Sequence, residues 1–378
     1  MRKILLATTA LVGFVTAGAA QAATAPLNVT VGGNIDFVAG AFHESRAAGA
    51  TNSASGEFET VYSLAFGVTG KTANGVDFGG NLVLDNDQYT GTMGGLNGNS
   101  NTISVTTATV FLSGAYGKLQ LGDSRGATDL TVTAPSVAGI RFIDFLDSSR
   151  FSKKFVLGVD AKDHSTNATY YTPKFGNNEY GKVQAAVTFT PRFGQFGSAV
   201  QLVGNSNVRD VIKGALAYTG NIKSVAVAAS ADIITGDITA AATSDRPFMS
   251  WGAGITGAYR DFTLGFNYTD LGHYGSTSIQ NKSQQVYGAG LKYAFCCKLA
   301  VSFNWLGGKA YDNALSLGTA GAQKYVKDFN NYNFGAAYTW APGLTTDVNA
   351  VLFSQTQDKT GAKDNDGYVL MISEKLAF

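Results

Sequence analysis

The 378-residue chain carries 28 basic and 27 acidic residues, and only 15% of its residues are charged. This balance gives no electrostatic reason to expect a nucleic-acid partner. The chain has 46 Gly, 24 Phe and 17 Tyr but only 6 Pro. Such a composition is typical of a large soluble β-protein or of a membrane β-barrel. The two cysteines, Cys296 and Cys297, are adjacent, which excludes spaced disulfides within the chain and leaves too few ligands for a zinc site.

The first residues are expected to be an export signal. Arg2 and Lys3 give a positive start, residues 4–20 are uncharged and mostly apolar, and residues 20–22 read Ala-Gln-Ala, a small-x-small cleavage pattern. A membrane-anchoring helix, which is the alternative, needs a longer apolar run. We therefore expect a signal peptide at 1–22 and a mature chain at 23–378, with 26 basic against 27 acidic residues once Arg2 and Lys3 are removed.

Alternating apolar and polar residues predict about 16 strands. The first row is representative, because Val29, Val31, Ile35 and Phe37 have polar residues between them. In a barrel the apolar row faces lipid, and the other row is expected to be polar because water fills the interior. Phe111 is expected in the apolar row of the fourth strand. The pattern is weakest at 208–219 and 222–232.

The predicted connections alternate in length. The short ones fall at 72–74, 115–117, 176–178, 220–221, 259–261, 296–297 and 341–343. The long polar ones fall at 42–56, 86–101, 123–167, 191–207, 232–247, 270–283, 307–328 and 355–366. Short turns at one rim and long loops at the other are typical of outer-membrane barrels and not of soluble sandwiches. We predict one all-β domain, a 16-stranded antiparallel transmembrane β-barrel with short periplasmic turns and long extracellular loops.

The loop at 123–167 is too long to be structureless in a compact domain unless it has a function. We expect it to fold into the barrel as a constriction loop, with Ile140, Phe142, Phe145 and Leu146 pressing against the wall. The residues expected at the pore constriction are Asp123, Asp129, Arg141, Asp144, Asp147 and Arg150.

A second set of charged residues is expected on the lumen wall. Its members are Asp36, Glu57, Glu59, Asp77, Lys118 and Lys182. Rings of carboxylates favour cations by direct attraction. The sequence therefore favours a weak cation preference, unless loop arginines, among them Arg125, form a basic half of the constriction.

The chain resembles the Gram-negative general diffusion porins of proteobacteria. Residues 116–123 (YGKLQLGD) resemble the family's fifth strand, residues 167–175 (NATYYTPKF) resemble its sixth, and Phe378 resembles its C-terminal aromatic residue. The Pro-Glu-Phe-Gly loop tip of enteric porins is absent. The resemblance implies a homotrimer in the outer membrane, in contact with the lipid bilayer and lipopolysaccharide, with one water-filled pore per subunit for small hydrophilic solutes. It also implies that the barrel-assembly machinery recognises Phe378.

No catalytic, metal or cofactor site is predicted. His43, His164 and His273 fall in different long loops, and His164 beside Asp163 and Ser165 is better explained as a solvated histidine than as part of a catalytic triad. Two alternatives stay open: a channel selective for sugars or anions, and a surface adhesin or enzyme in barrel form. A sugar channel would have aromatic residues in the lumen, whereas these are expected mostly in the outward row. An anion channel would have a ladder of Arg or Lys.

Overall fold

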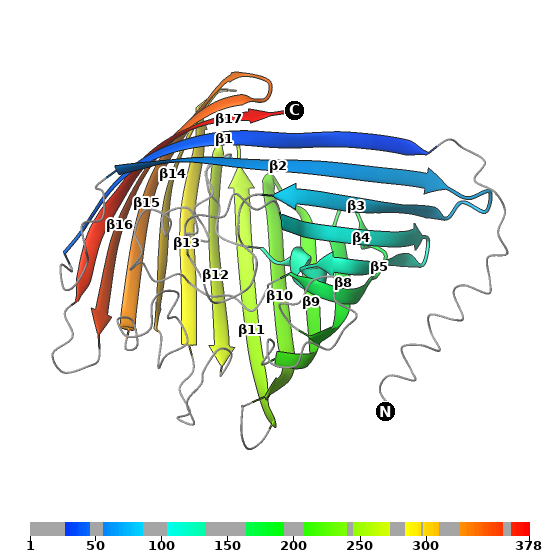
Figure 1. The fold of residues 1–378 in the computed structure, drawn as a ribbon. Helices are drawn as coiled ribbons and strands as arrows, with labels where there is room; N and C mark the ends of the chain where they lie inside the picture. Colours follow the sequence, from blue (N-terminus) through cyan, green and yellow to red (C-terminus); the bar gives the residue numbers. More distant parts are fainter. Residues whose placement is uncertain are drawn as a thin grey trace.

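The computed structural model describes residues 27–45, 56–85, 104–132, 164–192, 208–239, 245–272, 284–295, 298–309, 326–357 and 364–378. These residues form one antiparallel sheet that closes on itself into a barrel (Figure 1). Within these ranges, no helix is long and apolar enough to cross a membrane.

The predicted number of strands is confirmed. The strand segments are β1 (Asn28–Glu44), β2 (Gly56–Lys71), β3 (Asp77–Asp85), β4 (Ser104–Gly114), β5 (Gly117–Ser124), β6 (Ser165–Tyr171), β7 (Phe175–Asn177), β8 (Gly181–Arg192), β9 (Val208–Ile222), β10 (Val225–Thr239), β11 (Asp245–Tyr259), β12 (Phe262–Gly272), β13 (Gln284–Phe295), β14 (Leu299–Lys309), β15 (Val326–Ala341), β16 (Leu344–Gln357) and β17 (Asn365–Ala377). Both β6 and β7 pair with β8, so they are two parts of one strand and the barrel has sixteen strands.

The seam of the barrel joins the first strand to the last. β1 pairs with β17 from Asn34 opposite Ala377 to Glu44 opposite Gly367. Beyond the strand, Phe378 and Gly33 exchange two backbone hydrogen bonds, with N···O distances of 2.9 and 3.0 Å. Closure removes the free edges that an open sheet would expose to hydrocarbon.

The connections confirm the predicted alternation, with two corrections. At the short-turn end, the turns lie at 72–76, 115–116, 178–180, 223–224, 260–261 and 342–343, and a further connection joins β13 to β14 there, of which Cys296 and Cys297 lie outside the described residues. The other connections between strands lie at the opposite, long-connection end. The turns predicted at 176–178 and 220–221 lie further along the chain, at 178–180 and 223–224. The long loop predicted at 232–247 is only residues 240–244, because β10 and β11 extend further than expected. Alanine, serine and glycine on both faces of β10 hide its strand period.

The outward row is apolar, as predicted. On β1, Val29, Val31, Ile35 and Phe37 are between 47% and 61% exposed. Aromatic residues are common in this row. Tyr268, Tyr287 and Trp305 form contacts across β12, β13 and β14, with ring centroids 6.4 and 5.6 Å apart. Such a surface suits lipid contact, and aromatic girdles mark the interfaces of a membrane barrel.

The prediction of a uniformly polar inner row is wrong. Near the long-connection end, a band of buried apolar side chains runs along the inner face from β9 through β17 to β2. We call it the apolar belt: Val38, Val61, Val211, Ile234, Phe248, Leu271, Val286, Leu306, Phe329, Val351, Phe353 and Val369. Burial means that these side chains contact protein atoms and not open water, so an apolar row is tolerated there.

Phe111 is a second correction on facing. It lies opposite Gln120, which is a buried inner residue, and therefore faces inward and not outward. The pairing of β3 with β4 shifts between Val83 and Leu84, so that Thr106 is an extra residue on β4. One extra residue exchanges the two faces of a strand beyond it.

Deletion of Phe378 tests the contribution of the seam. It removes both hydrogen bonds to Gly33, which at about 0.5–1.5 kcal/mol each lowers the free energy of unfolding by about 1–3 kcal/mol. Urea unfolding of the detergent-refolded barrel measures this difference. The control is Phe378→Ala, which keeps both backbone bonds. Equal stability of the two variants would contradict the assignment.

Candidate functional site

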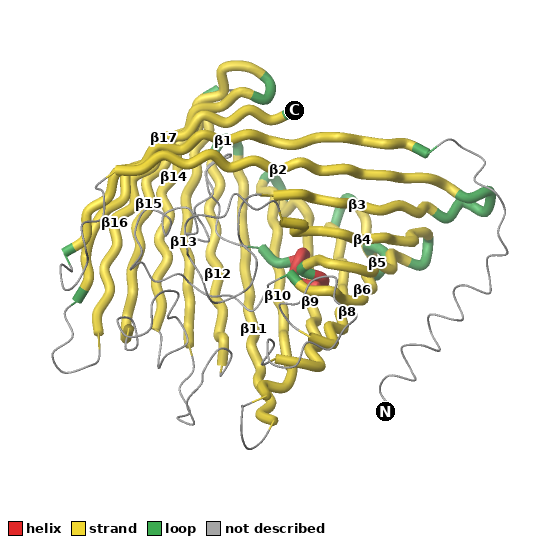
Figure 2. Tube along the Cα trace, viewed as in Figure 1, coloured by secondary structure: helices red, strands yellow, loops and turns green. Residues whose placement is uncertain are grey.

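The chain turns into the barrel immediately after β5. A short 3-10 helix, η1 (Gly126–Leu130), lies on the concave side of the sheet, in red in Figure 2. Gly126 has a φ of 70°, and a Cβ at this position would collide with the Thr188 hydroxyl on β8. The Ala127 N–H donates a hydrogen bond of 2.7 Å to that same hydroxyl. A glycine is therefore required where the chain approaches the inner wall.

Three further contacts hold this segment against the inner wall. The Lys213 ammonium on β9 donates to the Arg125 carbonyl at 3.0 Å, and the Tyr171 hydroxyl on β6 donates to the Gly126 carbonyl at 3.0 Å. The Val132 N–H donates to the Ser230 hydroxyl on β10 at 2.6 Å. Residues 125–132, which we call the entry segment, thus lie along the inner faces of β6, β8, β9 and β10. For these residues the predicted infolding is confirmed.

Gly254 on β11 lets the end of the entry segment approach the wall. A Cβ on Gly254 would collide with the Val132 carbonyl oxygen. Gly252 and Gly254 both lie inside β11. Here the absence of a side chain makes room for another part of the backbone.

Lys118, Asp129 and Tyr171 form a charged and aromatic group beside η1. The Tyr171 hydroxyl lies 3.3 Å from Asp129 Oδ2, and the Lys118 Nζ lies 5.0 Å from the ring centre of Phe111 and 5.4 Å from that of Tyr171. Desolvation raises the pKa of Asp129 above its ordinary value, against Arg125, the Tyr171 hydroxyl, Lys213 and Lys118, which lower it. The group places both signs of charge within one part of the lumen.

The residues predicted for the lumen wall have different environments. Asp36 is inward and buried, and Lys182 shares the inner row of β8 with Thr188 and Thr190. Asp77 lies at the short-turn end, where it forms a 3.4 Å ion pair with Lys71. Glu57 and Glu59 alternate with the exposed Phe58, so their positions share the face of the buried Val61.

The residues predicted for the constriction are only partly described. Asp129 lies in η1 inside the barrel. Asp123 lies in β5 opposite Ala108 and Thr166, and its carboxylate accepts a hydrogen bond from the Thr166 hydroxyl. Gln120, three residues earlier in β5, faces inward. Because side chains alternate between the two faces of a strand, Asp123 faces outward, away from the lumen. Arg141, Asp144, Asp147 and Arg150 lie outside the described residues.

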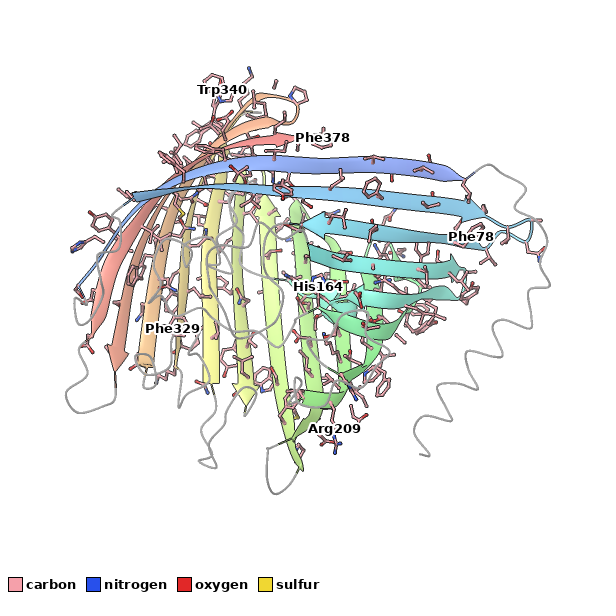
Figure 3. The ribbon with its side chains drawn as sticks, viewed as in Figure 1. Phe78, His164, Arg209, Phe329, Trp340 and Phe378 are labelled. Carbon is pink, nitrogen blue, oxygen red and sulfur yellow. The ribbon has the colours of Figure 1, made fainter. Side chains whose placement is uncertain are left out.

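His164 is not the solvated loop histidine that the sequence predicted. It directly precedes β6, and its Nε2 accepts a hydrogen bond of 3.2 Å from Arg125 Nε (Figure 3). Burial, followed by the charge of Arg125, lowers the pKa of His164 to about 4. The neutral imidazole therefore links the two ends of the segment between β5 and β6.

Sequence analysis missed the residues that hold the entry segment. Lys213 is fully buried and Thr188 is 1% exposed, yet neither belongs to a recognisable motif. Lys213 lies in β9, one of the strands with the weakest pattern. The one signal available was a lone lysine in a strand with few other charges, since a buried lysine needs a partner.

Substitution of Gly254 tests the seat of the entry segment. Gly254→Ala places a Cβ against the Val132 carbonyl and should break the bond between Val132 and Ser230. Trypsin cleavage after Arg125 in the folded barrel should accelerate about fivefold, as expected for about 1 kcal/mol from one lost hydrogen bond. The matched control is Gly257→Ala, whose Cβ would lie 3.5 Å from a Val225 methyl, an ordinary contact. Equal cleavage rates would refute this seat.

Acidification tests the role of His164. Its pKa is about 4 in the folded protein against an ordinary value of 6.5, so its contribution is fully present above pH 6.5 and is lost as pH falls towards 4. Hydrogen exchange in residues 125–132, corrected for the intrinsic pH dependence, should therefore accelerate over this interval. His164→Gln keeps an acceptor for Arg125 but does not titrate at this position, so its exchange should accelerate less than that of the wild-type protein over this interval. Equal acceleration in the two proteins would contradict the role.

Known proteins resemble this chain in sequence profile and in fold. The sequence profile of a family described as Gram-negative porin matches residues 7–358. No curated protein sequence matches the chain. Solved structures share the fold. An anion-selective porin from Comamonas acidovorans is 15% identical with a TM-score of 0.61, over 93% of this chain and 100% of that one.

Two further structures agree with this result. The outer membrane channel DcaP of Acinetobacter baumannii is 15% identical with a TM-score of 0.62, over 96% of this chain and 100% of that one. The trimer form of OmpT, an outer membrane protein of Vibrio cholerae, is 11% identical with a TM-score of 0.55, over 93% and 99% of the two chains. The structures share the fold, and the profile covers nearly the whole sequence. This chain therefore belongs to the Gram-negative porin family.

Proposed function

We propose that this protein is a porin through which small hydrophilic solutes and ions diffuse passively across the outer membrane. The observation that carries the proposal is a closed sixteen-stranded barrel whose entry segment lies against one inner wall. Barrels of this strand number leave an aqueous channel, whereas smaller ones fill with side chains. A channel without enzymatic activity is the function that family membership favours.

A weak preference for cations is part of the proposal. The inner wall carries the carboxylates of Asp36, Asp232 and Asp347, all at most 6% exposed, and Asp129 lies on the entry segment. Asp144 and Asp147 are proposed to face the constriction as well. Carboxylates around a narrow passage attract cations and repel anions.

Anion preference is the second candidate. It is favoured by Lys118, Lys182 and Lys213, which face inward from β5, β8 and β9. The similar porin from Comamonas acidovorans is anion-selective, but at 15% identity that likeness supports the fold alone. The Lys213 ammonium also donates a hydrogen bond to the Arg125 carbonyl. We give the carboxylates more weight because Asp36, Asp232 and Asp347 lie on β1, β10 and β16 and so are spread around the ring, whereas the lysines lie on β5, β8 and β9.

Assembly and location complete the proposal. The signal peptide at 1–22 would direct export, and Phe378 would be recognised by the barrel-assembly machinery. A homotrimer in contact with lipid and lipopolysaccharide is supported by the trimeric form of the similar Vibrio cholerae protein. The apolar outward rows supply surface both for lipid and for neighbouring subunits.

Neutralising Asp129 tests the direction of ion preference. In planar bilayers under a salt gradient, Asp129→Asn should lower the ratio of cation to anion permeability by about two- to fivefold, as expected for about 0.5–1 kcal/mol from a charge about 4–8 Å away in water. The matched opposite variant is Lys118→Met, which keeps the alkyl contact with Phe111 and should raise the ratio. Reversal potentials that move the other way, or not at all, would favour the second candidate.

A further inference from the structure

An open hollow lies on the inner wall at the short-turn end of the barrel. It has a volume of about 490 Å³ and extends over β8, β9, β10 and β11, which are neighbours in the sheet (Figure 1). Four of its lining residues are in register across these strands and face inward: Lys182, Thr219, Ala228 and Thr256. All four are half-buried or exposed, so a solute in the mouth of the barrel can reach them.

The polar side chains around the hollow supply mainly hydrogen-bond donors. A lysine ammonium such as that of Lys182 has three donors and no acceptor, and Thr219 and Thr256 add two hydroxyl groups. Asn177 lines the hollow as well, and its Oδ1 accepts two backbone N–H groups of the following turn, at 3.0 and 2.8 Å. Its amide N–H₂ group is therefore the part of the side chain that remains for a ligand.

Lys182 is the one charged residue among the described residues that line the hollow. Its ammonium forms no ion pair with any residue that the structure describes. Two other lysines that face inward near this end, Lys71 and Lys375, are directly opposite Asp77 and Asp36. The hollow thus differs from the rest of this rim, because its positive charge has no carboxylate across the neighbouring strand.

We propose that this hollow is a binding subsite for a small phosphorylated solute. A phosphate group has three strong acceptor oxygens, and its hydrogen bonds to an ammonium are strengthened by charge. The lysine, the two hydroxyl groups and the amide supply the matching donors. One lysine on an open wall binds weakly, which suits a passage, because a channel site has to release its solute.

The inference rests on the proposed diffusion channel and adds a solute class to it. Only the hollow at the short-turn mouth is involved. The ion preference of the whole passage is a separate property, which we assign to the charges around the entry segment.

Single-channel recording in planar bilayers tests this subsite, with glucose 6-phosphate as the probe and glucose as its uncharged counterpart. In the wild-type protein, glucose 6-phosphate should reduce the current in a saturable manner. It should act at a lower concentration from one compartment than from the other, because the hollow lies at one mouth of the barrel. Glucose should reduce the current only in proportion to its concentration.

Lys182→Gln removes the charge but keeps a polar side chain of similar length. The half-blocking concentration of glucose 6-phosphate should rise about tenfold, as expected for the loss of one hydrogen bond between charged partners. The difference between the two compartments should disappear. Ala228→Leu fills the hollow without a change of charge, so it should also weaken the block, and it replaces Lys182→Gln if that variant does not refold.

The matched control is Lys292→Gln. Lys292 faces inward near the same end, from β13, opposite Thr263 and Ser302, but it does not line the hollow. This variant removes the same charge from the lumen without touching the subsite. It should therefore keep the wild-type response to glucose 6-phosphate.

The outcomes separate the two proposals. A wild-type protein that conducts ions but shows no saturable response to glucose 6-phosphate overturns the subsite and leaves the channel intact. An equal shift in Lys182→Gln and Lys292→Gln also overturns the subsite, since the loss of any lysine charge from the lumen would then explain the result. A folded barrel that conducts nothing contradicts the diffusion channel and the subsite with it.

Discussion

Backbone hydrogen bonding in hydrocarbon is the constraint on which this structure depends. Lipid offers no partner for an exposed N–H or C=O group, so a sheet that crosses a membrane has to pair every strand on both sides. The pairing of β1 with β17 satisfies that requirement, and the two bonds between Gly33 and Phe378 extend it to the last residue. Once the ring is closed, its diameter follows from strand number, and the interior is wide enough to admit another part of the chain.

What enters the interior is held by polar contacts to a few wall residues. The entry segment has no extensive apolar core of its own; its backbone is bonded to hydroxyl groups of Thr188, Tyr171 and Ser230 and to the ammonium of Lys213. Glycines at 126 and 254 let the backbone come close enough for these bonds. The placement of charge in the lumen is a consequence, because Arg125 and Asp129 are carried on this segment.

The inner wall is divided into regions of different chemistry. Apolar side chains form a belt near the long-connection end, carboxamides gather on β14, β15 and β16, and lysines face inward from β5, β8 and β9. The entry segment carries Arg125 and Asp129, and the carboxamides lie on a different part of the wall.

The sequence by itself determined the outside of this protein. Lipid contact imposes an apolar row on every strand, and turns that differ in length at the two rims are visible as polar insertions, so strand number, fold and family could be predicted. The sequence did not predict which side chains of β4 face inward beyond Thr106, because this extra residue exchanges the two faces of the strand. It did not predict the length of β10, because small residues on both faces hide the strand period. Only the tertiary structure decided the inside. Which side chain suits a lumen position depends on the residues that closure of the ring places opposite to it. Lys213, Thr188 and Asn333 lie beside residues that are distant in sequence, so no local sequence period could predict these neighbours.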